Sequence, residues 1–203
     1  MSYQIQAVEL GEVNIGNTVT VGKVFDLVSL AEMKGYLKQS FTDLTAEDRL
    51  ISQMIQSARR WIEGYIGKTI IEKDITAFTD DELAEFVLPY PPITEITSVK
   101  RIDVQGTETV LVKNTDYYEI GLNEKKLQFM NVWATVSFSI AGIQVAYTAK
   151  MTDTVELNIC KTACMMIVAE NYYNRGMSSD ASVSVIPFDA KTLLNPIKLM
   201  RTL

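Results

Sequence analysis

Two long segments of the chain carry apolar side chains at the spacing of an α-helix. In residues 45–66 these side chains fall within one stripe when successive residues are placed about 100° apart, and Gly67 follows as a C-cap. Residues 154–173 form the second segment, which begins after Asp153, a favourable N-cap. A capping box predicts a shorter helix over residues 29–38. The chain is therefore expected to contain a small helical core built from separate stretches.

Between these helices the period changes to two residues. Apolar and polar side chains alternate through much of residues 69–150, and Gly, Pro and Asn interrupt the alternation. This pattern predicts a meander of antiparallel strands inserted into the helical core, so the expected fold class is α+β, with two long helices plus short ones. The expected strands cover residues 86–88, 96–104, 109–112, 118–121, 126–130, 132–140 and 143–147.

The same patterns divide the chain into five consecutive parts. The first has the pattern of two short strands, which form either a plain edge hairpin or an arm that pairs with a neighbour's sheet. The last is apolar enough that we expect it to dock on another surface. The parts are an N-terminal β arm 1–28, the first part of the helical core 29–68, the β insertion 69–150, the second part of the helical core 151–182 and a C-terminal docking tail 183–203.

The second long helix is apolar on every side in its middle. Residues 163–169 include no strongly polar side chain, and a helix of that kind must be covered all round. The cover is either the chain's own β part or another subunit, and we favour another subunit. The side chains expected at such a subunit interface are Met165, Met166, Ile167 and Val168.

Composition and charge narrow the classes of function. The 203 residues include 19 basic and 25 acidic side chains, a net charge of −6, and no dense basic run that would favour nucleic-acid binding. There is no histidine, which removes the commonest general base and metal ligand. The N-terminus lacks the features of a signal peptide, and no apolar run reaches the ~20 residues of a membrane span. We therefore expect a protein of a cytosol-like, reducing compartment.

The residues that remain as candidates for chemistry have simpler structural explanations. Cys160 and Cys164 lie on one helix face, which is typical of small core side chains rather than of a zinc site. Arg59 and Glu63 are expected to form a modest surface ion pair. No glycine-rich phosphate-binding motif occurs. We therefore assign no catalytic residue, no metal ligand and no cofactor.

Two clusters keep a second interpretation open. The first is acidic and consists of Asp80, Asp81, Glu82 and Glu85. It is either a solvated loop or a site for a divalent cation. The second is aromatic and consists of Trp133, Tyr117 and Tyr118. These rings either pack across neighbouring strands or form a platform for a ligand, and in both clusters we favour the structural interpretation.

Several segments, taken in order, resemble those of one protein family. They are Leu30–Leu37, Ala58–Lys68, Leu88–Ile93, Ile96–Val99, Val145–Ala149, Asn171–Arg175, Ile186–Phe188 and Leu193–Pro196. Together they are similar to the head–tail connector, or adaptor, proteins of tailed bacteriophages. The chain departs from that family at Lys150, where glycine is usual, near Thr154, where a proline is expected, and in the greater length of residues 1–28.

The resemblance implies a structural virion protein rather than an enzyme. It implies a homo-oligomeric ring, commonly of twelve subunits, that sits beneath the portal protein in the virion neck after assembly in the host cytoplasm. Such a ring extends the DNA channel, which DNA passes without specific binding, and receives the tail or a tail-completion or stopper protein, with no membrane involved. The C-terminal segment is expected to reach the portal through Val185, Ile186, Phe188, Leu193, Leu194, Ile197, Leu199 and Met200.

Two other functions remain as alternatives. A different ring-forming neck or tail-completion protein would bind the tail tube and not the portal. An enzyme that uses carboxylates would need a cleft with a paired Asp/Glu site, and it would lose activity on a substitution such as Asp81→Asn.

Overall fold

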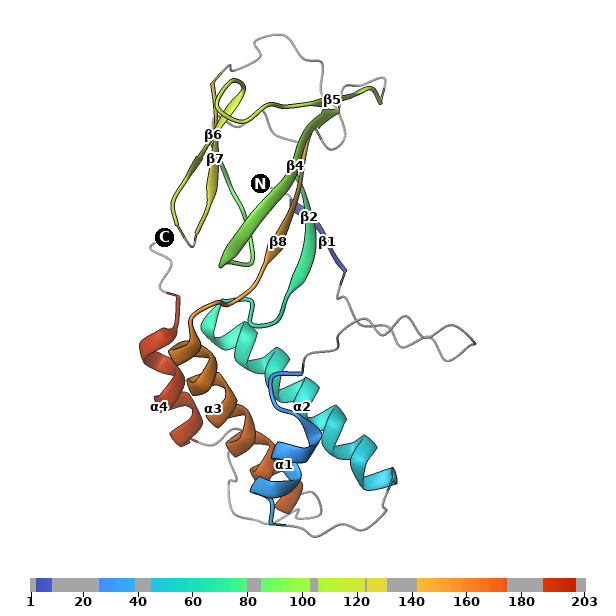
Figure 1. The fold of residues 1–203 in the computed structure, drawn as a ribbon, viewed down its shortest axis with the longest axis vertical. Coiled ribbons are helices and arrows are strands. Elements are labelled where there is room, and N and C mark those ends of the chain that lie inside the picture. Colours follow the sequence, from blue (N-terminus) through green and yellow to red (C-terminus); the bar gives the residue numbers. More distant parts are fainter. Residues whose placement is uncertain are drawn as a thin grey trace. The chain divides into compact units, whose positions relative to one another are not determined.

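The computed structural model describes residues 3–8, 26–38, 45–79, 85–102, 106–122, 124–130, 142–174 and 188–199. The chain forms two compact units, each built from two stretches of sequence (Figure 1). The helical unit comprises Val24–Ile71 and Met151–Leu203, and the β unit comprises Met1–Lys23 and Glu72–Lys150. The predicted α+β class is confirmed. The strand expected over residues 132–140 lies outside the described residues.

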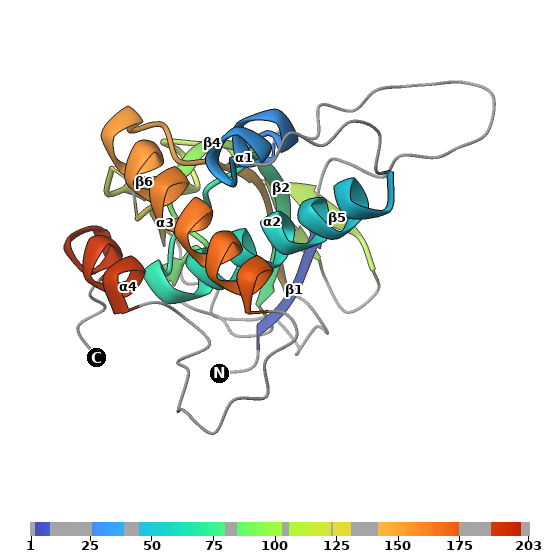
Figure 2. The same cartoon turned by 90° about the horizontal axis from the view of Figure 1, so that it is seen from below.

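The described residues of the helical unit form two long helices and three short elements. Within it α3 packs against both α2 and α4, and α1 packs against α2 (Figure 2). The long helices begin and end within one residue of the predicted positions. The elements are α1 (Leu30–Tyr36), α2 (Thr45–Ile66), α3 (Thr154–Tyr173), α4 (Phe188–Leu194) and the 3-10 helix η1 (Asn195–Ile197).

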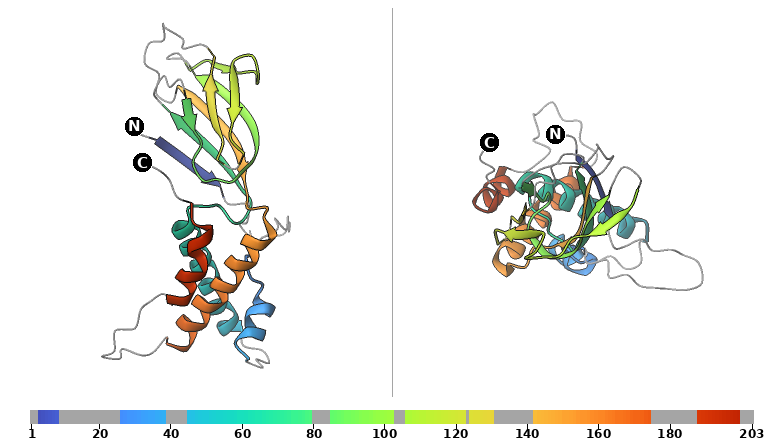
Figure 3. Two further views of the ribbon diagram at one scale, coloured as in Figure 1. Left: turned by 90° about the vertical axis from the view of Figure 1, so that its left-hand side faces the viewer. Right: turned by 90° about the horizontal axis from the view of Figure 1, so that it is seen from above.

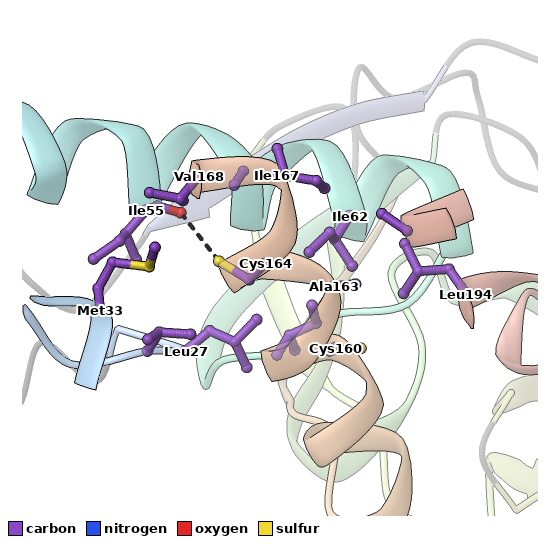
Figure 4. Close-up of a cluster of buried hydrophobic side chains, with 14 of the residues drawn as sticks. Leu27, Met33, Ile55, Ile62, Cys160, Ala163, Cys164, Ile167, Val168 and Leu194 are labelled. Atoms are coloured by element: carbon purple, nitrogen blue, oxygen red, sulfur yellow. Dashed lines mark hydrogen bonds between the residues drawn. The ribbon is translucent and has the colours of Figure 1, made fainter. Parts of the chain in front are cut away.

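The apolar middle of α3 is covered by the chain's own helices. Between Ala163 and Asn171 no side chain of α3 is exposed. Figure 4 shows Ala163, Cys164 and Ile167 pointing toward Ile55 and Ile62 of α2, and all five belong to one buried cluster. Further cover comes from two other segments, through Leu27, Val28, Met33 and Leu194. The β part, which the sequence interpretation considered as the internal cover, has a separate core.

The end of the predicted N-terminal arm belongs to this helical core. Leu27 and Val28 are buried there, immediately before α1. The beginning of the predicted arm, Tyr3–Val8, forms strand β1 in the β unit. The residues assigned to the arm therefore contribute to both units. Leu27 and Val28, which lie just before α1, supply part of the apolar surface that buries α3.

Helix α1 begins where the capping box predicts. The Ser29 hydroxyl accepts a hydrogen bond from the Glu32 amide at 3.2 Å, and the Ser29 amide donates to the Glu32 carboxylate at 2.9 Å. The same carboxylate accepts a hydrogen bond from Lys161 of α3 at 2.9 Å. The bond from Lys161, followed by those from Ser29, lowers the pKa of Glu32 to about 2. Glu32 thus joins the start of α1 to α3.

In the part of the β unit that the structure describes, two antiparallel sheets share one apolar core (Figure 3). Strand β8 lies between β2 and β4, so the last strand of the unit pairs with its earlier strands rather than following them in a simple meander. The five-stranded sheet has the order β1 (Tyr3–Val8), β2 (Lys73–Thr79), β8 (Ile143–Ala149), β4 (Ile93–Ile102) and β5 (Glu108–Val110). The three-stranded sheet has the order β3 (Glu85–Val87), β7 (Lys126–Phe129) and β6 (Tyr117–Ile120).

Strand β2 was not among the strands expected from the sequence. Its inward positions are Ile75, Ala77 and Thr79, all of which are buried. Alanine and threonine give a weak apolar signal, so the alternation is visible only once the pairing of β2 with β8 is known.

The predicted surface pair Arg59–Glu63 is instead buried, and this expectation was wrong. The two side chains are 4% and 10% exposed, and Arg59 Nη1 donates to Glu63 Oε2 at 3.3 Å. The other oxygen of Glu63 accepts a hydrogen bond from the Ile70 amide at 2.9 Å. The chain turns at Gly67, which has a positive φ of 72°, and runs back past Glu63. Glu63 is buried because its carboxylate accepts a hydrogen bond from a backbone amide of this returning segment, which would otherwise have no partner there.

The burial of this pair predicts a large effect of removing one partner. Glu63→Ala is expected to lower the free energy of unfolding by about 3 kcal/mol, because Arg59 keeps a buried charge without this carboxylate. The control Glu72→Ala removes the partner of Lys150 from a pair whose side chains are 53% and 45% exposed, and it should cost less than about 1 kcal/mol. Urea unfolding followed by circular dichroism measures both. Equal losses in the two variants would contradict the burial of the Arg59–Glu63 pair.

Candidate assembly surfaces

The side chains predicted to contact a portal differ in their burial. Leu194 and Ile197 are buried in the core of the helical unit, and Leu193 and Leu199 are half-buried. Phe188 is the first residue of α4. Val185, Ile186 and Met200 lie outside the described residues. The part of the predicted docking tail that the structure describes therefore docks on the chain's own helices.

Polar contacts hold this C-terminal segment against the end of α2. The Tyr65 hydroxyl donates to Asn195 Oδ1 at 2.7 Å, and the Leu199 amide donates to the Ile66 carbonyl at 2.8 Å. The Lys198 ammonium lies 4.7 Å from the centre of the Tyr65 ring. The last carbonyls of a helix have no partner within it, so residues 195–199 act as a cap for α2.

The four side chains predicted at a subunit interface fall into two pairs. Ile167 and Val168 are buried in the chain's own core. Met165 and Met166 are half-buried and pack at its edge. A neighbouring subunit can reach the two methionines on the folded chain, whereas Ile167 and Val168 are already covered by the helices around α3.

The two thiols are core side chains. Cys160 and Cys164 are free and buried, and Cys164 Sγ lies 3.9 Å from the Ile55 carbonyl oxygen. Burial raises the pKa of both thiols to about 12. A thiol that stays protonated is a poor nucleophile and a poor metal ligand. Among the described residues no group of three or more His, Cys, Asp or Glu side chains is placed to hold a metal ion.

The two clusters with open interpretations are only partly described. Of the acidic cluster, Glu85 forms an ion pair with Lys126 at 2.9 Å, and the other members lie outside the described residues. Of the aromatic cluster, Tyr117 is buried and its ring packs on Phe129, its direct cross-strand partner, at 6.4 Å. Tyr118 lies on the opposite face of the same strand and is exposed. These two tyrosines therefore do not form a shared platform.

The outer face of the three-stranded sheet exposes apolar side chains, of which only Tyr118 was a candidate from the sequence. Val87 and Ile120 flank Lys126 in one cross-strand row, and Tyr118 lies in the next row. Leu122, in the turn after β6, is 90% exposed. Alternation along a strand predicts two faces but does not tell which face is buried, so this outward row was not predicted. Exposed apolar side chains grouped on one face are typical of an interaction surface.

None of the helices in the described part of the chain is both long enough and apolar enough to span a bilayer. The long helix with the most apolar composition, α3, carries charged side chains at Glu156, Lys161 and Glu170.

The sequence matches one protein family over most of its length. Residues 26–186 match the family described as head completion protein. This range runs from the start of the helical core to the segment before α4, so it includes parts of both units. No curated protein matches the sequence.

Solved structures share the fold. A chain of the virion of a native gene transfer agent (GTA) particle has a TM-score of 0.65 and 21% identity, covering 87% of this chain and 92% of that chain. A chain from the neck of an empty GTA particle, computed with C6 symmetry, has a TM-score of 0.66 and 20% identity. The match covers 98% of this chain and 97% of that chain. A chain from the neck of a native GTA particle, computed with C12 symmetry, has a TM-score of 0.64 and 19% identity. The match covers 92% of this chain and 96% of that chain. At these identities the similarity establishes a common fold.

The docking of the C-terminal segment on the chain itself can be tested by substitution. Leu194→Ala is expected to lower the free energy of unfolding by about 3 kcal/mol, because Leu194 is fully buried against α2 and α3. The control Leu122→Ala alters an exposed side chain and should change stability by less than about 0.5 kcal/mol. Both are measured on the isolated chain by urea unfolding. A Leu194→Ala variant as stable as the parent would show that α4 does not pack on the helices in the free chain.

Proposed function

The chain belongs to the head completion protein family, and from that premise we propose that it is a ring-forming adaptor in the neck of a virion. The observation that carries this proposal is the family match over residues 26–186. The shared fold with neck chains of a GTA particle supports it, because that likeness covers almost the whole of both chains. The proposed role is structural, and no catalytic step is part of it.

We propose a closed ring of twelve copies that extends a DNA channel beneath the portal. One of the similar neck structures was computed with C12 symmetry, which supports this subunit number. A head-to-tail ring requires two unlike surfaces on each subunit. The outer face of the three-stranded sheet and the half-buried pair Met165 and Met166 are two such surfaces on the described residues.

The set of residues proposed to contact the portal is smaller than the set that the sequence alone implied. Leu194 and Ile197 stabilise the chain's own core, so they are withdrawn from the set of surface contacts. The proposed portal contacts are now Val185, Ile186, Phe188, Leu193, Leu199 and Met200. Complete deletion of residues 183–203 is unsuitable as a test, because it removes Ala190, Leu194 and Ile197 from the helical core.

The direct test is the mass of the complex that the full chain forms with its portal ring. Native mass spectrometry should detect twelve copies of the chain on each portal. Ile186→Asp should abolish the complex, because a carboxylate in an apolar contact is costly to desolvate. The matched control Val155→Asp changes an exposed apolar side chain of α3 and should leave the complex intact.

One outcome would contradict the adaptor proposal, and a second would contradict the proposed portal contact. A chain that stays monomeric beside the portal but binds the tail tube would support a tail-completion protein instead. A complex that survives Ile186→Asp and is lost with Val155→Asp would place the portal contact on the helical unit's α3 rather than on the C-terminal segment.

A further inference from the structure

One face of α2 exposes basic and uncharged polar side chains and no carboxylate. Its exposed side chains are Arg49, Gln53, Gln56, Ser57 and Arg60. From residue 49 to residue 62 the sequence contains no aspartate or glutamate, in a chain that has 25 acidic residues. The exposed side chains of this face therefore carry only positive charge, in a chain with a net charge of −6.

These side chains form one straight stripe. Positions 49, 53, 56 and 60 follow the i, i+4, i+7, i+11 spacing, which keeps them on a single side of a helix. The opposite side carries Ile51, Ile55, Ala58 and Ile62, which are buried in the helical unit. With a rise of about 1.5 Å per residue, Arg49 and Arg60 lie ~16 Å apart along the helix axis.

The stripe lacks the features of a stable protein interface. Among the described residues the large apolar side chains that are exposed belong to other elements, such as Tyr36 in α1 and Tyr173 in α3, and none belongs to α2. Protein interfaces depend on a few buried aromatic or aliphatic anchors surrounded by a polar rim. A surface made of arginine, amide and hydroxyl groups instead matches phosphate oxygens, which accept hydrogen bonds from all three.

We propose that this face of α2 lines the DNA channel of the ring and contacts the phosphate backbone of duplex DNA. The inference rests on the proposed ring and names the surface that its channel presents. Arginine pairs with phosphate without reading base sequence, so DNA of any sequence passes. Because the whole chain has a net charge of −6, attraction to DNA depends on a local basic surface such as this stripe.

The test measures how the full chain binds a fluorescein-labelled 30-base-pair duplex of arbitrary sequence as the salt concentration rises. Each phosphate contact contributes about 0.9 to the slope of log K against log salt. The double variant Arg49→Gln, Arg60→Gln should therefore reduce the slope by roughly 2, and weaken binding severalfold at low salt. The matched control Lys100→Gln, Lys150→Gln removes the same charge from the β unit, outside the stripe, and should leave the slope unchanged.

The outcomes separate this inference from the proposed ring. A slope that is the same in the parent and the Arg49/Arg60 variant would overturn the inference, as would an equal reduction in both double variants or no binding of the parent at low salt. Native mass spectrometry with the portal is run on the same samples. Loss of the ring with unchanged DNA binding in the Arg49/Arg60 variant would make the stripe a protein interface. Failure of the parent to form a ring would refute the proposed function, while the salt slope would still report on α2.

Discussion

The structure depends on covering a helix that is apolar on all sides. From Ala163 to Ala169, α3 offers no side chain suited to water, so its stability requires partners around its whole circumference. The chain supplies them from segments far apart in sequence: α2, the pair Leu27 and Val28, α1 and α4. The described helices therefore cover most of α3 before any subunit arrives, and residues Glu72–Lys150 of the β unit are inserted between the two halves of the helical unit with their own core.

This closure determines which surfaces remain for assembly. Apolar residues of the C-terminal segment that look like a free docking tail are partly used to cap α2 and to complete the cover of α3. The surfaces that remain accessible are chemically varied: apolar side chains on the three-stranded sheet, half-buried methionines at the edge of α3, and the polar stripe on α2 that carries Arg49 and Arg60. A subunit of a ring around DNA requires such separate surfaces, for its neighbours, for its axial partners and for the channel.

Local chemistry in the sequence predicted most of the fold. Capping at Ser29 and Asp153 located the starts of α1 and α3, because side-chain caps act within a few residues. Strand β2 was missed and Arg59–Glu63 was misplaced, because both depend on contacts made elsewhere: pairing with β8 and the return of the chain past Glu63 to Ile70. The candidate surfaces were hardest to predict, since periodicity identifies two faces of an element and leaves the choice of the buried face to tertiary packing.

The central claim is that α3 is covered within a single chain, and amide hydrogen exchange tests it most directly. The measurement uses the isolated full chain, without portal, at a concentration where it is monomeric. If α3 is covered within a single chain, the amides of residues 163–169 exchange only through global unfolding, as slowly as those of residues 51–62 in α2, which pack on them. Rapid exchange in the monomer that becomes slow only in the ring would contradict it, and would show that another subunit completes the cover of α3.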